Sequence, residues 1–114
     1  MKQNEIIEGN KVIADFAALK SESGYWLLIV KSDSGWFNFL ELKYNESWDW
    51  LMPVVEKIES LGYYFMINKW TSAYTNGADG DRISITTVEG KTKILNTWKA
   101  VVEFIKWHNQ NNSK

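Results

Sequence analysis

The sequence predicts an α+β fold in which an antiparallel sheet, made of two β-hairpins, packs against two helices in the order ββαββα, preceded by a short N-terminal helix. Apolar and aromatic runs of strand length are bounded by clusters of Ser, Asp, Asn and Gly, which are typical of hairpin turns. Two longer segments carry apolar residues at helical spacing. Each of these helices has one wide apolar face, and a sheet can cover both.

The composition is that of an ordinary globular protein. The chain has 114 residues, 45% of them hydrophobic and 24% charged, which excludes disordered, collagen-like and coiled-coil classes. We expect a single domain over residues 1–114, with polar tails at about 1–9 and 109–114. No apolar run approaches the ~20 residues of a membrane span. The start of the chain also lacks the apolar stretch of a secretory signal, so we expect a cytoplasmic protein.

The first part of the chain predicts a helix followed by a hairpin. Asn10 can cap a short helix whose apolar residues recur at helical spacing as far as Leu19. A Ser- and Gly-containing turn at 21–24 breaks this pattern. The run that begins at Tyr25 is rich in aromatic and β-branched residues, and a second turn separates it from another apolar run. Residues 25–43 are therefore predicted to form a β-hairpin.

The middle helix is predicted from one continuous apolar face. Ser47 or Asp49 can cap it, and Leu61-Gly62 ends it. Pro53 has no N–H and is expected in the first turn, so the regular helix would start between Asp49 and Met52. At about 100° per residue, the apolar face contains Trp50, Leu51, Val54, Val55, Ile58 and Leu61.

The rest of the chain predicts a second hairpin and a last helix. Residues 63–75 and 82–88 form the two strands, and the Asn- and Gly-containing stretch 76–81 connects them. A helix over about 93–109 follows. Its apolar arc contains Leu95, Trp98, Val101, Val102, Phe104 and Ile105.

Residue types that commonly carry catalysis are few. The chain has no cysteine, which excludes disulfides, thiolate nucleophiles and Cys-ligated metals. The single histidine, His108, lies near the edge of the last apolar arc, where imidazoles are usually partly buried. Gly90-Lys91-Thr92 follows a predicted strand as in a P-loop, but Ile85 stands where the first glycine of that motif belongs. We therefore expect no enzyme activity, no catalytic residue, no cofactor and no metal site.

The charge balance disfavours nucleic acid as a partner. Thirteen basic and fourteen acidic residues give a net charge of -1, whereas duplex-binding surfaces usually carry a basic excess. Single-stranded nucleic-acid binding by aromatic stacking is an alternative, and a small hydrolase using carboxylates or His108 is a third. The stacking alternative would use Trp36, Phe37, Phe39, Trp70 or Tyr74, with Lys43, Lys69, Lys91 and Lys93 on phosphates.

Aromatic residues are unusually frequent. Seven Trp, five Tyr and five Phe make up 15% of the chain, more than a small core can enclose, so some indoles must reach the surface. Trp107 lies about 180° from Trp98 on the last helix and is expected to turn away from the core unless the N-terminal helix covers it. Exposed indoles are frequent in binding hot spots. The expected partner-binding residues are Trp107, whichever of Trp48 and Trp50 is exposed, Trp70 and Tyr74.

Three segments carry a family resemblance: 13–16 (IADF), 47–59 (SWDWLMPVVEKIE) and 100–107 (AVVEFIKW). They resemble a group of small uncharacterised proteins from Bacteroidetes genomes and their phages. The resemblance implies a phage or mobile-element accessory protein and brings no site residues. Together with the surplus of Trp and the lack of nucleophiles, the resemblance predicts a non-enzymatic protein-binding module. Its expected partner is a bacterial host protein, for example a defence component such as a CRISPR nuclease that it would inhibit.

Overall fold

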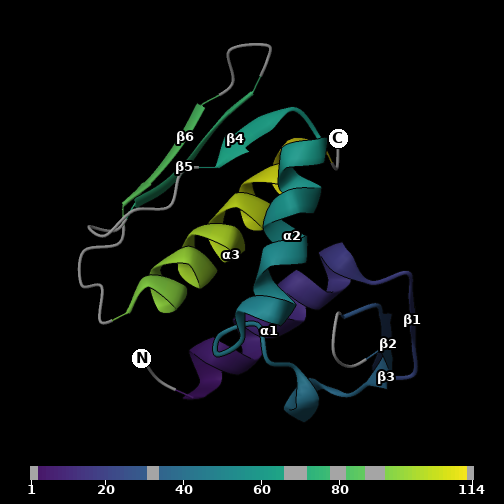
Figure 1. The fold of residues 1–114 in the computed structure, drawn as a ribbon. Helices are drawn as coiled ribbons and strands as arrows, with labels where there is room; N and C mark the ends of the chain where they lie inside the picture. Colours follow the sequence, from purple (N-terminus) through teal and green to yellow (C-terminus); the bar gives the residue numbers. More distant parts are fainter. Residues whose placement is uncertain (1–2, 31–33, 66–71, 78–81, 87–91, 113–114) are drawn as a thin grey trace.

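The computed structural model describes residues 3–30, 34–65, 72–77, 82–86 and 92–112, and these form an α+β fold (Figure 1). The helices of this described part are α1 (Gln3–Ala17), η1 (Phe39–Glu41, a 3-10 helix), α2 (Trp48–Ser60) and α3 (Lys93–Asn112). One antiparallel sheet has the order β1 (Lys20–Glu22), β2 (Tyr25–Leu28), β3 (Gly35–Phe37). The other has the order β4 (Tyr63–Phe65), β5 (Ser72–Gly77), β6 (Arg82–Thr86).

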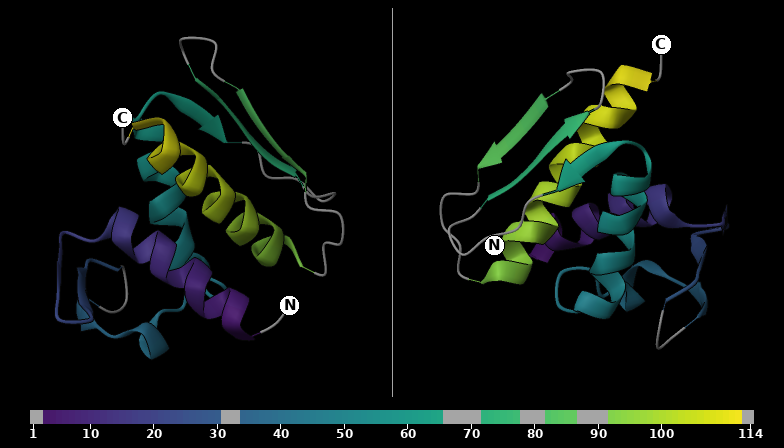
Figure 2. Two further views of the ribbon diagram at one scale, coloured as in Figure 1. Left: turned by 180° about the vertical axis from the view of Figure 1, so that it is seen from behind. Right: turned by 45° about the horizontal axis from the view of Figure 1, so that its top comes forward.

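The prediction of an α+β fold with antiparallel strands is confirmed, but the prediction of one sheet in the order ββαββα is wrong. Strand β1 precedes β2, and the predicted strand over 63–75 is divided between β4 and β5, which pair with Tyr63 opposite Gly77. The two sheets lie on opposite sides of the long helices (Figures 1 and 2). The sheet of β1, β2 and β3, called the first sheet below, lies beside α1. The sheet of β4, β5 and β6 packs against α2 and α3, so the edges of the two sheets cannot meet.

The first sheet is built on a two-residue turn. Glu22 pairs with Tyr25, which leaves Ser23 and Gly24 as the connection, and their φ angles are 50° and 82°. Positive φ at both central positions is the geometry of a type I′ turn, whose twist matches that of the strands it joins. The register places Ser21, Trp26 and Phe37 in one row across the sheet, and Lys20, Leu27 and Trp36 in the next row, on the opposite face.

Helix α1 is longer than predicted. It begins at Gln3, so residues 3–9, predicted as a polar tail, are helical, and Asn10 lies inside the helix instead of capping it. The tail predicted over 109–114 is likewise helical as far as Asn112. Gly9 brings α1 close to α3, because a Cβ atom at this position would overlap the Trp98 ring. Tertiary contact with α3 therefore overrides the local cap preference of Asn10.

Asn10 connects three segments of the chain through its side chain. Its Nδ2 donates hydrogen bonds to the Leu42 carbonyl at 3.3 Å and to Asn45 Oδ1 at 3.0 Å. Its Oδ1 accepts a hydrogen bond from Trp98 Nε1 at 2.8 Å. Only 3% of Asn10 is exposed, and a buried amide without hydrogen-bond partners would destabilise the fold. These bonds satisfy that amide.

Helix α2 begins at Trp48, which places Pro53 in the second turn and corrects the expectation of the first. Trp50 and Leu51, both buried, precede the proline and anchor this end of the helix in the core, while Pro53 itself faces solvent. The predicted apolar face is confirmed except for Leu61, which is exposed because it is the C-terminal cap and no longer follows the helical path.

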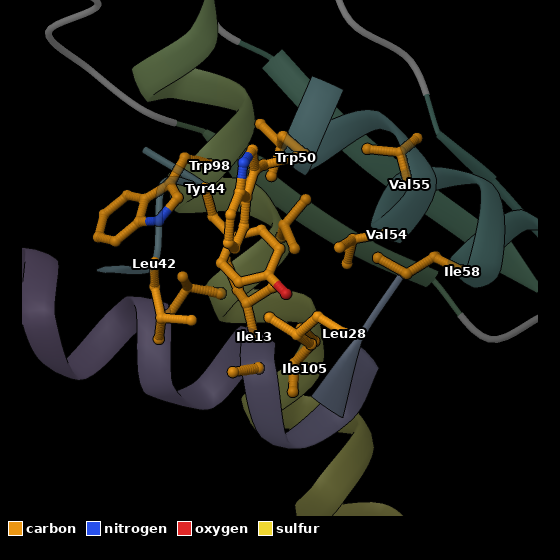
Figure 3. Packing of buried hydrophobic residues seen from close by; sticks show 14 of the residues in the cluster. Ile13, Leu28, Leu42, Tyr44, Trp50, Val54, Val55, Ile58, Trp98 and Ile105 are labelled. Atoms are coloured by element: carbon orange, nitrogen blue, oxygen red, sulfur yellow. The ribbon is translucent and has the colours of Figure 1, made fainter. Parts of the chain in front are cut away.

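The core lies between the helices and the inner face of the first sheet, and Figure 3 shows its side chains converging from these elements. Trp50 makes edge-to-face ring contacts with Phe37 at 4.9 Å and with Tyr44 at 5.2 Å between centroids. The predicted arc of α3 is buried except for Leu95, which is half-buried. Its buried members are Trp98, Val101, Val102, Phe104 and Ile105.

Burial of Tyr44 makes the stability of the protein sensitive to alkaline pH. Its side chain is 2% exposed, and desolvation raises the pKa of its phenol above the usual value. A raised pKa in the folded state means that this contribution to stability is complete below pH ~10 and is lost as the pH rises above that value. Above pH ~10, the loss should approach about 1.4 kcal/mol per pH unit.

We therefore expect Tyr44→Phe to lose less stability than the wild type between about pH 9 and pH 11, because it removes the group that must ionise on unfolding. Urea unfolding of both proteins at several pH values measures this difference. Parallel pH profiles would contradict it.

Candidate functional site

Two exposed aromatic side chains share the outer face of the first sheet. Tyr25 on β2 and Trp36 on β3 are 47% and 45% exposed. Their chain neighbours Trp26 and Phe37 face inward, where Trp26 is buried and Phe37 packs on Trp50. Because successive side chains of a strand point to opposite faces, the burial of the inner pair turns the outer pair towards solvent.

The register sets the relative positions of the two exposed residues. Leu27 pairs with Trp36, and Trp26 pairs with Phe37, so Tyr25 and Trp36 are diagonal neighbours on adjacent strands. Diagonal neighbours on one face lie ~7–8 Å apart, within reach of aromatic side chains. A shallow hollow of about 440 Å³, largely open to solvent, lies here and is lined by Glu22, Ser23, Tyr25 and Trp36.

The sheet that carries this hollow is tied to the helices. Trp26 Nε1 donates a hydrogen bond of 2.7 Å to Asp15 Oδ1, which joins β2 to α1. Leu28 continues the inner face of β2 and is 2% exposed. The outer rings therefore stand on a scaffold that core packing holds in place, as a preorganised binding surface requires.

A second hollow, of about 420 Å³, lies between α1 and α3. Its apolar lining includes Trp98 and Val102, which are only 3% and 5% exposed and so offer little surface to a ligand. Its remaining lining comprises Gly9 and Val12 together with the polar and charged residues Asn4, Glu5, Glu8, Lys99, Glu103 and Lys106. The outer face of the first sheet exposes much more aromatic surface and is the stronger candidate site.

The prediction that Trp107 turns away from the core is wrong. Its ring lies 5.9 Å from Phe104 and 6.1 Å from Tyr63 between centroids, and the side chain is half-buried. Trp107 faces away from Trp98 on the helix, but α3 is packed on more than one side, and β4 brings Tyr63 against this one. The N-terminal helix reaches His108 instead, through an edge contact of Phe16 at 6.1 Å.

The other predicted partner-binding residues are Trp48, Trp50, Trp70 and Tyr74. Trp50 is 2% exposed and belongs to the core, which removes it from any binding surface. Trp48 is the exposed member of that pair, at 37%. Trp70 and the side chain of Tyr74 lie outside the described residues.

His108 is half-buried, as the sequence predicts for an imidazole at this edge of the apolar arc. Its ring stacks on Phe104 with a centroid distance of 5.7 Å and an interplanar angle of 15°. This contact gives His108 a packing role on α3.

The described residues of the nucleic-acid alternative differ in their exposure. Phe37 is half-buried against Trp50, whereas Phe39 is exposed with Lys11 Nζ over its ring at 5.2 Å. Lys43 follows η1, and Lys93 begins α3. Lys69 and Lys91 lie outside the described residues.

Sequence reasoning missed Tyr25 as a site residue and considered Trp36 only as a platform for bases. The signal that could have found both is the alternation of side chains along two short strands. Once Trp26 and Phe37 are assigned inward, Tyr25 and Trp36 must face outward.

Among the residues described, no group of three or more His, Cys, Asp or Glu side chains is arranged to hold a metal ion. Within the same residues, no helix has the length and apolar character needed to cross a membrane. Comparison with protein-family models, curated proteins and solved structures finds no match to the chain.

Proposed function

We propose that this chain is a non-enzymatic protein-binding module that recognises its partner through the outer face of the first sheet. The observation that supports this function is the pair of aromatic rings, Tyr25 and Trp36, each nearly half exposed on a scaffold fixed to the core. Tyr and Trp are the residue types most enriched in interface hot spots, where each can contribute ~2 kcal/mol or more.

The surroundings of the two rings suit a protein surface. Leu27 lies half-buried between the strands on the same face and adds apolar contact area. Lys20 and Glu22, both exposed, supply one positive and one negative charge at the β1 side. An apolar centre with charges at its margin is the usual arrangement of a protein interface.

The proposal that the partner is a bacterial host protein, including a defence component, rests on the resemblance of segments 13–16, 47–59 and 100–107. In the structure these segments fall in or at the start of α1, α2 and α3, which form most of the core. The resemblance therefore concerns the scaffold, and the outer face of the first sheet supplies the recognition surface.

A comparison of two exposed apolar positions tests this function. We expect wild type and Leu61→Ser to capture the same protein from a bacterial lysate, whereas Trp36→Ser binds that protein at least ~10-fold more weakly in a subsequent titration. Leu61 is the matched control, because it is 47% exposed at the end of α2, outside the first sheet. A folded Trp36→Ser protein with wild-type affinity would contradict the proposal.

Single-stranded nucleic acid is the competing ligand, since bases could stack on the same two rings. The face carries Glu22 beside Lys20 and so has no excess of positive charge for phosphates. We expect a fluorescent oligothymidylate to show no saturable binding at low salt. Binding that weakens as salt rises, and that Trp36→Ser abolishes, would replace the protein-binding proposal.

A further inference from the structure

We propose that the hollow between Tyr25 and Trp36 binds the guanidinium group of an arginine side chain on the partner protein. This inference rests on the proposed function and specifies the chemistry of the same surface.

The spacing of the two residues along the sheet suits a flat cation. Diagonal neighbours on one sheet face lie ~7–8 Å apart along the backbone, so a group bound midway between Tyr25 and Trp36 can contact both side chains. A cation within ~6 Å of an aromatic centroid is attracted by the ring quadrupole. Both residues line the same hollow, which is open to solvent.

Glu22 gives the hollow a negative charge. It pairs with Tyr25 across β1 and β2, which places both side chains on the same face, and it lines the hollow. Among the described residues, the salt bridge found, Lys11 with Glu8, does not involve it. A carboxylate beside two aromatic side chains attracts a cation and repels a phosphate. The hollow therefore favours a guanidinium group over a nucleotide, whose base could stack but whose phosphate would be repelled.

Lys20 is the basic residue that the register brings to the same face, but it does not line the hollow. Its partner Leu27 separates it from Trp36, so Lys20 and Trp36 stand two strand spacings, ~9–10 Å, apart. Arginine fits the hollow better than lysine, because guanidinium is planar, stacks on aromatic rings and is more weakly hydrated than an ammonium group.

Titration with two blocked amino acids tests the proposal directly. N-acetyl-arginine methylamide and N-acetyl-citrulline methylamide have nearly the same shape, but only the first carries a charge. We expect the arginine probe to shift the Trp36 indole N–H signal saturably in NMR spectra of the full chain. The citrulline probe should bind at least ~3-fold more weakly, since the cation–π and carboxylate contacts require the charge.

Three variants locate the interaction while Trp36 remains as the reporter. Glu22→Gln and Tyr25→Ser should each weaken binding of the arginine probe by ~3-fold or more, and the control Lys20→Gln should not weaken it. Equal binding of both probes, or no saturable shift with either, would overturn the proposal. The comparison of Trp36→Ser with Leu61→Ser in partner binding does not depend on the charge of the arginine probe. The arginine site can therefore fail its test while the protein-binding function passes its own, and the two failures are distinguishable.

Discussion

Trp98→Ala should lower the free energy of unfolding by about 3–5 kcal/mol, the range for truncating a buried aromatic side chain. Trp98 is 3% exposed and lies against Gly9 at the approach of α1 to α3. The substitution would leave a cavity between the two helices and would also remove the donor that Asn10 Oδ1 accepts from. Part of the loss is therefore packing and part is a broken buried hydrogen bond.

Urea unfolding of the variant measures this loss, and Trp98→Phe separates its two components. Phenylalanine keeps most of the apolar volume but cannot donate a hydrogen bond to Asn10. The free energy of unfolding of Trp98→Phe should therefore lie between those of the wild type and Trp98→Ala. A Trp98→Ala protein as stable as the parent would show that Trp98 does not belong to the core.

Asn10→Ala should cost about 2–4 kcal/mol, because it leaves two buried groups without their partner. The Trp98 Nε1–H and the Leu42 carbonyl both bond to the Asn10 side chain, which is 3% exposed. Each unsatisfied buried group costs ~1–3 kcal/mol. Asn45→Ala is the matched control. Because Asn45 is half-buried, this substitution should lower the free energy of unfolding by less than Asn10→Ala does.

A double-mutant cycle tests whether Asn10 and Trp98 act together. Combining Asn10→Ala with Trp98→Phe should cost less than the sum of the single changes, because the hydrogen bond between them can be lost only once. Strict additivity would mean that this bond contributes nothing to stability. Thermal or urea unfolding of the four proteins provides the measurement.

The helices of the second part of the chain could be predicted because local signals and tertiary packing agree there. The apolar face of α2 and the arc of α3 follow helical spacing, and Gly62, at a φ of 98°, stands where the sequence predicts α2 to end. The prediction that Trp98 lies in the core is confirmed for the same reason.

The beginning of α1 could not be predicted, because it depends on contacts between distant residues. Asn10 has the local chemistry of a cap, yet its hydrogen bonds to Leu42, Asn45 and Trp98 place it inside the helix. Gly9 weakens helix propensity but permits the approach of α3. The division of the strands into two sheets likewise depends on which side of the helices each one packs.

The sequence predicted that surplus aromatic residues reach the surface, and the structure places them elsewhere than expected. The angle of Trp107 on one helix predicts an exposed ring, but Tyr63 from β4 packs against it. Tyr25 and Trp36 are exposed because they alternate with inward-facing neighbours on paired strands. A helical wheel contains no information about what another element places against its polar side.

Fluorine NMR of the chain labelled with 5-fluorotryptophan tests the central claim most directly. The Trp36 signal is assigned by its absence from Trp36→Phe, and the captured bacterial protein is then added to the labelled wild type. If the partner binds the outer face of the first sheet, the Trp36 signal shifts or broadens on binding, while the signals of the buried Trp50 and Trp98 keep their positions. Formation of a complex in which the Trp36 signal is unchanged would contradict the account.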